Sequence, residues 1–459
     1  MNEQFNTLDL REELLSNLSE LGFSKMTPIQ MGSLPKVLDG KDVLGQAKTG
    51  SGKTAAFGLG ILNELDTTIV HTQSLILCPT RELAEQVAVE IRKLARMMKN
   101  VKVLTITGGV GYYHQENSLS HGAHIIVGTP GRVKKLIKTN FIRLSNLKFF
   151  VLDEADRMLD MGFYDDIMDI EEKLPRERQS LLFSATFPEE ILDLSEDIQY
   201  DAYRSIVDSK HEEGHIEQYF YSVSSHKDKE EALLKLLGEY QPKRLIIFCK
   251  TKVTTDKVAR FLNKNDIAAA SIHGNLDQNE RTRVLTKFSN RSLSALVATD
   301  VAARGLDIKE LEAVINFDLA IDPQDYIHRV GRTGRAGEKG LAFSLFVEQE
   351  RYKIEEVEEL QNLKHDTLDS NDLSLKSYDL SPPMRTLFIS GGKKDKLRPG
   401  DILGALVKEA LLSPDEVGNI TILPILSYVA VKSDKLEQAI SKLNEGRIKN
   451  RKFRVGVAN

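Results

Sequence analysis

The feature that most restricts the possible folds of this chain is a regular alternation of short apolar runs and amphipathic segments. Within residues 1–205 each apolar run has the length of a strand and is followed by a stretch with helical spacing. The runs lie at residues 42–47, 74–80, 102–108, 124–130, 149–156 and 180–186. Strands that are apolar on both faces are typical of a parallel sheet covered by helices on both sides. The pattern therefore predicts a doubly wound α/β domain.

The same alternation recurs over residues 216–363, which predicts a second doubly wound parallel-sheet domain. Its apolar runs lie at residues 244–250, 269–274, 294–300, 311–318 and 340–346. Two polar stretches, 206–215 and 364–383, bound this part of the chain, and we interpret both as interdomain linkers.

Residues 384–459 show a different order of elements. Strand patterns at 387–390, 418–423, 428–431 and 453–457 are interleaved with helical spacing at 401–412 and 435–443. The order is β-α-β-β-α-β, which predicts a small α+β domain of ferredoxin-like arrangement. The predicted fold class is therefore α/β, with two doubly wound domains followed by one small α+β domain.

The composition is that of an ordinary globular protein, with 41% hydrophobic and 28% charged residues. It excludes collagen-like, low-complexity and disulfide-stapled proteins. The two cysteines, Cys78 and Cys249, each end an apolar run, and we expect reduced core thiols in a cytoplasmic protein. The first residues lack the apolar centre of a signal peptide, and no run approaches the roughly 20 apolar residues that cross a bilayer. We therefore expect no membrane partner.

Charge is unevenly distributed along the chain, whose formal net charge is −5. Residues 384–459 contain 14 Lys and Arg against 8 Asp and Glu, whereas the remainder contains 48 against 59. One interpretation is an acidic body with a basic appendage that meets a polyanion. The alternative is a solvated surface with a small basic excess, and charge alone does not separate the two.

A candidate phosphate site lies between the first apolar run and the helical segment after it. It is formed by Ala47, Lys48, Thr49, Gly50, Ser51, Gly52, Lys53 and Thr54. Small residues in a strand–loop–helix context let backbone N–H groups approach phosphates, as in a P-loop. Lys53 would reach the β- and γ-phosphates, and Thr54 would hold Mg²⁺. The alternative is a flexible loop.

Residues 153–156 read Asp-Glu-Ala-Asp and directly follow the buried run FFVL. Their carboxylates are expected at the carboxyl edge of the sheet, where ligands of α/β proteins bind. Asp153 would complete the Mg²⁺ shell, and Glu154 would polarise the attacking water. The alternative, an acidic start to a solvated helix, fits the tetrapeptide but not its position after a buried strand.

With these motifs the chain resembles the DEAD-box helicases of superfamily 2 over nearly all of residues 1–363. Further matches are TPIQ at 27–30, PTRELA at 79–84, GG at 108–109, TPGR at 129–132, SAT at 184–186, ATD at 298–300, RGLD at 304–307 and HRVGRTGR at 328–335. That family also begins its P-loop with alanine, as Ala47 does here. The resemblance implies two RecA-like domains, ATP and Mg²⁺ as cofactors, and RNA as the substrate.

The resemblance also implies roles around ATP. Gln30 matches an adenine-reading glutamine, and a side-chain amide offers the donor and acceptor that an adenine edge requires. Asp307 matches a ribose contact, and His328 a residue that couples the SAT segment to the γ-phosphate. Arg332 and Arg335 match arginine fingers, and we expect them near the start of a helix, facing one direction. An aromatic residue upstream, Phe5, is either a ligand contact or a hydrophobic plug.

The RNA-facing residues implied by the resemblance are mostly small, hydroxyl-bearing or basic. Such side chains suit phosphates and 2′-hydroxyls and carry little base information. The set is Pro79, Thr80, Arg81, Gly109, Thr129, Arg132, Thr251, Gln278, Arg281, Thr299 and Asp300.

Residues 384–459 resemble the C-terminal RNA-binding domain of a bacterial DEAD-box subfamily, most specifically over residues 391–401. That subfamily is directed to a hairpin of 23S ribosomal RNA, so the implied partners are 23S rRNA and pre-50S particles. The strand order is RRM-like, with Phe388 and Tyr428 where bases would stack and Ala430 where a second central aromatic is expected. We therefore expect basic residues to carry more of the binding: Lys393, Lys394, Lys396, Arg398, Arg447, Lys449, Arg451 and Lys452.

The leading hypothesis is an ATP-dependent RNA helicase that remodels 23S rRNA during assembly of the 50S subunit. One alternative is a DNA-directed superfamily 2 translocase, although DNA is not the expected substrate. Another is an ATP-switched RNA clamp or scaffold with little unwinding. The complete hydrolytic set of Glu154, Arg332 and Arg335 argues against the clamp. We expect a monomer.

Overall fold

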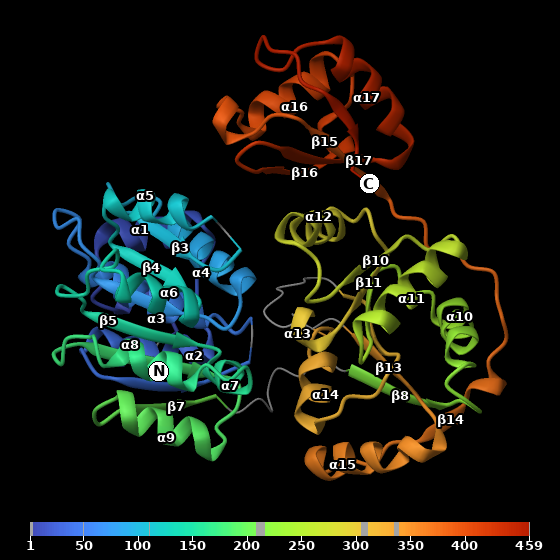
Figure 1. Ribbon diagram of the computed structural model, residues 1–459, viewed down its shortest axis with the longest axis horizontal. Coiled ribbons are helices and arrows are strands. Elements are labelled where there is room, and N and C mark those ends of the chain that lie inside the picture. The colour runs from blue at the N-terminus through green and yellow to red at the C-terminus, as the bar shows by residue number, and fades with distance from the viewer. Residues whose placement is uncertain are drawn as a thin grey trace. The chain divides into compact units, whose positions relative to one another are not determined.

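The computed structural model describes residues 3–48, 50–109, 111–207, 216–303, 311–334 and 339–458. The described residues divide into two compact units, one ending at residue 207 and the other running from 216 to 458 (Figure 1). The first unit is built on a seven-stranded parallel sheet in the order β3-β4-β2-β5-β6-β1-β7. Its strands are β1 (Val43–Gln46), β2 (Ser74–Leu77), β3 (Val103–Ile106), β4 (Ile125–Gly128), β5 (Phe149–Asp153), β6 (Gln179–Ser184) and β7 (Tyr203–Ile206).

Helices cover both faces of the first sheet because its strands bury both sets of alternating side chains. In β5, Val151 joins one hydrophobic core, while Phe150 and Leu152 join the other on the opposite face. Bounds are η1 (Phe5–Thr7), α1 (Glu12–Glu20), α2 (Pro28–Leu38), α3 (Lys53–Glu64), α4 (Arg81–Leu94), α5 (Tyr112–Ser120), α6 (Pro130–Lys138), α7 (Ala155–Asp160), α8 (Tyr164–Glu171) and α9 (Glu189–Ile198).

The second unit contains a sheet of the same kind, ordered β10-β11-β9-β12-β13-β8-β14 and parallel throughout. Its strands are β8 (Ile216–Ser222), β9 (Leu245–Phe248), β10 (Ala269–Ile272), β11 (Ala295–Ala298), β12 (Ala313–Asn316), β13 (Gly340–Phe346) and β14 (Thr367–Asp369). Its helices are α10 (Lys229–Tyr240), α11 (Lys252–Lys264), α12 (Gln278–Ser289), α13 (Asp300–Ala303), α14 (Pro323–Val330), η3 (Glu348–Glu350), α15 (Arg351–Gln361) and η4 (Ser370–Asp372).

The C-terminal domain is a four-stranded antiparallel sheet, ordered β16-β17-β15-β18, with two helices on one face. Leu387 and Val429 point into the core with the helices, so Phe388 and Tyr428, one position away, lie on the outer face. The elements are β15 (Met384–Ile389), η5 (Lys393–Asp395), α16 (Pro399–Lys408), η6 (Pro414–Glu416), β16 (Val417–Ile422), β17 (Ser427–Lys432), η7 (Ser433–Lys435), α17 (Leu436–Glu445) and β18 (Val455–Val457).

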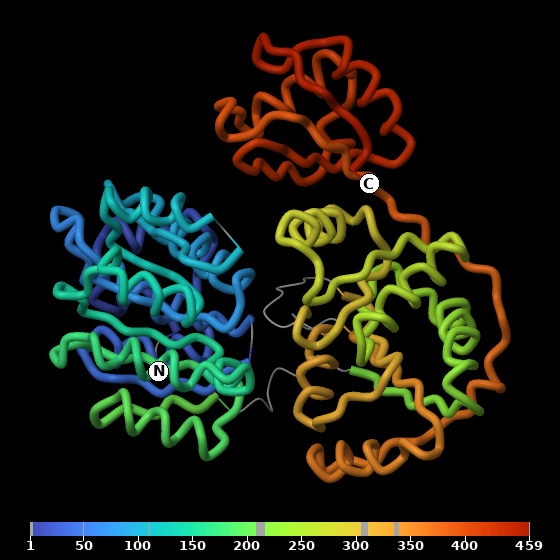
Figure 2. The backbone as a smooth tube through the Cα atoms, viewed as in Figure 1, coloured from blue at the N-terminus to red at the C-terminus, as the bar shows by residue number. Residues whose placement is uncertain are grey.

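The predicted fold class is confirmed: two RecA-like parallel-sheet domains precede a small β-α-β-β-α-β domain. Three strands escaped the sequence patterns, namely β7, β8 and β14. Parts of the stretch 364–383 also pack on the second domain, since β14 pairs with β8, Lys376 forms an ion pair with Glu239 of α10, and Leu380 is buried in that domain's core. Figure 2 shows this stretch, in orange, leading from the second sheet to the C-terminal domain.

Two smaller expectations concern the cysteines and the membrane. Cys78 and Cys249 are free thiols with no exposed surface, and burial raises the pKa of both. Within the described ranges, no helix has the length and apolar character that crossing a membrane requires.

Candidate functional site

The phosphate loop connects β1 to α3. Gly52 caps α3 with a left-handed φ of +94°, a conformation that favours glycine, and a Cβ there would lie 2.5 Å from Nε2 of Gln30. The Lys53 ammonium, 5% exposed, donates to the carbonyl of Ala47 at 3.0 Å. It also lies 4.0 Å from Oδ1 of Asp153. The loop, its lysine and the first acidic residue of the 153–156 motif therefore meet at one edge of the sheet, while Thr49 lies outside the described residues.

Gln30 is buried beside the phosphate loop, whereas Phe5 is buried in the core of the first domain. Gln30 accepts from the Thr27 amide at 2.9 Å and donates to the carbonyl of Gly52 at 3.0 Å. The residue predicted to read adenine thus contacts the phosphate loop itself. Phe5 is 4% exposed and belongs to the core of the first domain, so the structure places it as a hydrophobic plug, and its contact with a ligand stays a prediction.

Asp153 and Glu154 are both 2% exposed at the end of β5. Burial raises the pKa of Asp153 to about 6, against the attraction of the Lys53 ammonium. Oδ1 of Asp153 has no hydrogen-bond partner within the described residues. Glu154 adopts a left-handed φ of +55°, and its Oε2 accepts from Nη1 of Arg157 at 2.8 Å in a buried ion pair. Such backbone strain clusters at functional sites.

Asp156 joins the 153–156 motif to the SAT segment after β6. Its Oδ2 accepts from the amides of Ala185 and Thr186 and from the Thr186 hydroxyl, each at 3.1 Å. These three hydrogen bonds therefore couple the position of the 153–156 motif to that of the SAT segment.

The RNA-facing candidates of the first domain gather at the carboxyl ends of β2, β3 and β4, which are neighbours in the sheet. Thr80 caps α4, and Arg81 lies over Gly109, where an added Cβ would be 1.9 Å from Nη1 of Arg81. Gly109 also has a φ of +74°, so two observations explain glycine there. The remaining candidates at these strand ends are Pro79, Thr129 and Arg132.

Gln115 is a residue that the sequence reasoning missed. It is 4% exposed, accepts from Nη1 of Arg132 at 2.7 Å and donates to the carbonyl of Thr107 at 2.8 Å. Arg132 is thereby tied to the loop after β3. A single polar residue in α5 carries no sequence signal for this bridge.

In the second domain the candidates lie at the ends of β9, β10 and β11, again neighbouring strands. Thr251 caps α11, accepting from the Thr254 amide at 3.1 Å, and Gln278 and Arg281 lie in the first turn of α12. Arg281 donates to the carbonyl of Ala302 at 2.7 Å. Thr299 precedes α13.

Asp300 has a partner inside the protein. Its two carboxylate oxygens accept from Nε and Nη2 of Arg329 at 2.6 and 2.7 Å. Such a bidentate pair holds the guanidinium in one plane. The Asp300 carboxylate would repel an RNA phosphate, and its paired oxygens instead hold Arg329 in position. Contact between Asp300 and RNA stays a prediction.

The expectation that Arg332 lies near the start of a helix is wrong. Helix α14 ends at Val330, and Arg332 follows in the turn, 5% exposed. His328 is half-buried in the last turn of the same helix. Asp307 and Arg335 lie outside the described residues.

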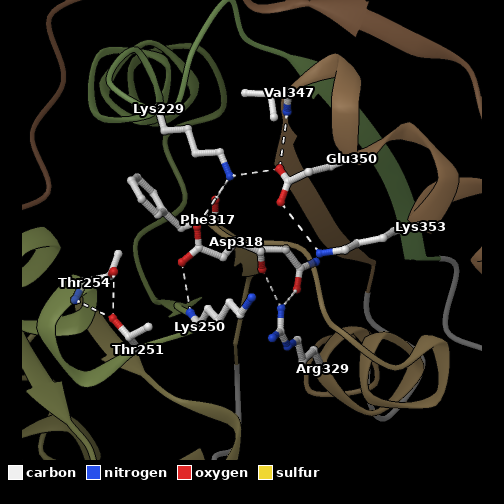
Figure 3. A network of polar contacts seen from close by, with 11 residues as sticks. Lys229, Lys250, Thr251, Thr254, Phe317, Asp318, Arg329, Val347, Glu350 and Lys353 are labelled. Atoms are coloured by element: carbon white, nitrogen blue, oxygen red, sulfur yellow. Dashed lines mark hydrogen bonds and ion pairs between the residues drawn. The ribbon is translucent and has the colours of Figure 1, made fainter.

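Figure 3 shows a polar network within the second domain, which includes the buried Lys229. Its ammonium, 1% exposed, donates to the carbonyl of Phe317 at 2.9 Å and lies 3.4 and 3.5 Å from carboxylates of Asp318 and Glu350. Oδ2 of Asp318 accepts from the Lys250 amide at 2.9 Å, just before Thr251.

The same network reaches α14. Nη1 of Arg329 donates to the carbonyl of Asp318 at 2.8 Å. The turn at Thr251, the loop at Asp300 and the helix that carries His328 are thus connected by hydrogen bonds within one domain. Sequence patterns missed Lys229 because a lysine at the start of an amphipathic helix is usually solvated.

Replacing Lys229 with methionine is expected to destabilise the second domain by about 3 kcal/mol, because two carboxylates lose their buried cation. Lys257→Met is the control, since Lys257 pairs with Glu230 at 3.0 Å but is 64% exposed, and its loss should cost under about 1 kcal/mol. Hydrogen exchange of the backbone amides in β9 and β12 measures the loss of stability in each of the two variants. Equal losses would show that the buried amine contributes no more than a surface pair.

Eight basic residues of the C-terminal domain lie on two neighbouring loops, and we name this part of the surface the basic edge. Nζ of Lys449 donates to the carbonyl of Lys396 at 2.8 Å, and Arg451 lies 3.8 Å from Asp395. The loops at 391–398 and 447–454 are thereby held together. All eight predicted basic residues are exposed: Lys393, Lys394, Lys396, Arg398, Arg447, Lys449, Arg451 and Lys452.

The predicted stacking aromatics are less accessible. Phe388 and Tyr428 are cross-strand neighbours on β15 and β17, but Tyr428 is only 5% exposed and Phe388 is half-buried. Base stacking on these rings stays a prediction, and it would require Tyr428 to be uncovered.

Three family models match the chain: DEAD/DEAH box helicase at residues 27–194, helicase conserved C-terminal domain at 228–337, and DbpA RNA binding domain at 386–457. A phosphate loop and acidic motif in a matched helicase domain define the class as a nucleotide-dependent helicase.

Relatives narrow that class. The chain is 47% identical to the ATP-dependent RNA helicase DbpA of Escherichia coli, over 98% of both chains. It is 43% identical to the DEAD-box ATP-dependent RNA helicase CshA of Bacillus cereus, over 80% of this chain and 70% of that one. The chain therefore belongs to the DEAD-box family of ATP-dependent RNA helicases, and it closely resembles DbpA over nearly its whole length.

A solved structure agrees with the helicase part. Dbp5 of S. cerevisiae bound to RNA and ADP BeF3 is 30% identical, with a TM-score of 0.74 over 81% of this chain and 96% of that one. The likeness supports the two RecA-like domains.

Proposed function

We propose that the chain couples RNA-stimulated ATP hydrolysis to local unwinding of 23S rRNA during assembly of the 50S ribosomal subunit. The observation that carries the rRNA target is the basic edge within a domain matched by the DbpA RNA-binding model. Eight exposed cations on two joined loops suit a structured polyanion. The proposal includes a monomeric enzyme that acts in the cytoplasm on pre-50S particles.

The first domain supplies the residues that would hold ATP with Mg²⁺. The unpartnered, buried Oδ1 of Asp153, close to the Lys53 ammonium, fits a metal ligand. Asp153 and Thr54 would hold the ion, which would neutralise charge on the β- and γ-phosphates. Gln30 would read the adenine, and Lys48, Thr49, Gly50, Ser51 and Gly52 would surround the phosphates.

In the proposed reaction, each domain would contribute some of the required groups. Glu154 would orient and polarise the attacking water, while Arg332 and Arg335 would neutralise charge that develops on the γ-phosphate. Asp307 would contact the ribose. Because neither domain holds the full set, hydrolysis would require their closure around ATP and RNA.

The test compares ATPase stimulation by a 23S rRNA fragment, an unrelated RNA and duplex DNA, for the full chain and for a chain ending at Pro383. The full chain is expected to prefer the 23S fragment. The shortened chain should keep a lower ATPase stimulation that does not distinguish between RNAs. Its second domain should still fold, because the chain retains Leu380 and the rest of that domain's core. Equal stimulation by DNA would favour the DNA translocase, and an unchanged preference after truncation would refute the targeting role.

A further inference from the structure

Strand β3 ends the first sheet, and its outer side is open. It pairs with β4 on one side, and no strand lies beyond it in the described part of the sheet (Figure 1). The carbonyl of Lys102 accepts from the amide of Ile125, so the backbone groups at even-numbered positions of this strand face β4. Because successive residues of a strand direct these groups to opposite sides, those of Val103 and Thr105 point away from the sheet.

A hollow lies along this outer side, between the last turns of α4 and α5. Its volume is about 430 Å³, and it is lined by residues 101–104, by Arg92 of α4 and by Asn117, Ser118 and His121. We name it the β3 groove. A volume of this size is within the range of binding sites, and one wall of this site is a strand with outward-facing backbone groups.

The β3 groove is positively charged. Arg92 and Lys102 line it, and among the described residues no Asp or Glu does. Nζ of Lys102 donates to the carbonyl of His121 at 2.8 Å, and an ammonium has two further protons to donate. Arg92 pairs with Glu85 at 3.7 Å, but the two side chains are 42% and 61% exposed, so a ligand carboxylate can replace this weak pair. An acidic ligand is therefore favoured.

The strand determines which kind of acidic ligand fits. An extended peptide carries N–H and C=O groups with the same repeat as β3, about 3.3 Å per residue, and can pair with both kinds of group. A phosphate backbone presents mainly acceptors and would leave the outward carbonyls without a donor. Nη2 of Arg92 donates to the carbonyl of Val103 at 3.0 Å, and this oxygen has a second lone pair for a peptide N–H.

We propose that the β3 groove binds an extended acidic segment of a partner protein, which adds to the first sheet as a further strand beside β3. Pairing with Val103 and Thr105 would hold the segment, and its alternate carboxylates would meet Arg92 and Lys102. The groove adjoins the amino end of β3, whereas the RNA-facing candidates lie at the carboxyl ends of β2, β3 and β4. The proposal is therefore independent of the RNA target.

The first test measures binding of three fluorescent peptides to the full chain at low salt. The acidic probe is Glu-Val-Glu-Thr-Glu-Val-Glu, and the basic probe has lysine in place of each glutamate. The third is the acidic probe with every internal amide N-methylated, so that it keeps its charge but cannot donate to the carbonyls of Val103 and Thr105. The acidic probe should bind, the basic probe should not, and methylation should weaken binding about tenfold. No binding of the acidic probe overturns the proposal, as does a methylated probe that binds equally well.

The second test removes the two cations with Arg92→Gln and Lys102→Gln together. Affinity for the acidic probe should fall about fivefold, because two exposed charge pairs are lost. The control is Lys173→Gln with Arg176→Gln, which makes the same change in charge at exposed positions before β6 and should leave the affinity unchanged. Equal losses in both double variants would show that only net charge matters and would overturn the assignment to the groove. Displacement of the peptide by a short single-stranded RNA would overturn a protein partner.

Hydrogen exchange locates the bound peptide even if a variant folds poorly, because it uses the wild-type chain. The amides of Val103 and Thr105 face away from β4 and should exchange quickly, whereas the Leu104 amide faces β4 and should exchange slowly. With the acidic probe at about ten times its Kd, exchange at Val103 and Thr105 should slow about tenfold, with no change at Leu104. Protection elsewhere on the chain without protection of these two amides overturns the proposal.

Discussion

Glu154→Gln is expected to lower the rate of ATP hydrolysis by about 10³-fold while ATP and RNA remain bound. Glutamine has the shape of glutamate but cannot take up a proton, so the attacking water loses its base. The backbone of Glu154 is strained, with φ at +55°, and the side chain is 2% exposed beside Arg157. This geometry favours a carboxylate held in one orientation.

Single-turnover hydrolysis and equilibrium binding of ATP and RNA measure the two effects separately. Glu177→Gln is the control, because Glu177 is exposed in the loop before β6. Turnover near the wild-type rate would refute the role assigned to Glu154. A loss of ATP binding would instead show that the buried pair with Arg157 supports the nucleotide pocket.

Arg332→Lys is expected to slow hydrolysis by about 10³- to 10⁵-fold, the range typical of an arginine finger. Lysine keeps the charge but presents a single point of contact, whereas guanidinium donates through a planar fork. Arg332 lies in the turn after α14 and is 5% exposed, so its direction is set by the surrounding chain.

The measurement is single-turnover hydrolysis at saturating RNA, with ATP affinity determined in parallel. Arg260→Lys, on the exposed side of α11, is the control. A rate within threefold of wild type would exclude Arg332 from the transition state. A weaker ATP affinity at an unchanged rate would assign it to ground-state binding.

Continuously apolar strands were the most readable part of the fold. The runs at 149–153 and 245–248 became central strands because both of their faces are buried, which leaves no polar position to obscure the pattern. Strands β7 and β14 were missed because most of their side chains are exposed or half-buried, Tyr203 and Leu368 among them. Without a continuous run of buried apolar residues, neither strand leaves a readable pattern in the sequence.

The residues of the candidate site also fall into those that the sequence predicts and those that it does not. Lys53, Asp153 and Glu154 were predictable because they follow buried strands, and the structure brings the first two to within 4.0 Å. Lys229 and Gln115 were not predictable, since each bonds groups that are distant in sequence or belong to another element.

What the sequence alone determined is the order of strands and helices and the chemistry at each strand end. Both follow from local periodicity and from residue types, such as a glycine where φ must be positive. Only the tertiary structure decided which strands are neighbours, that Asp300 is paired with Arg329, and that Thr386 is buried against Asn290. Those contacts join residues far apart in the chain, and their energies depend on burial that no local pattern encodes.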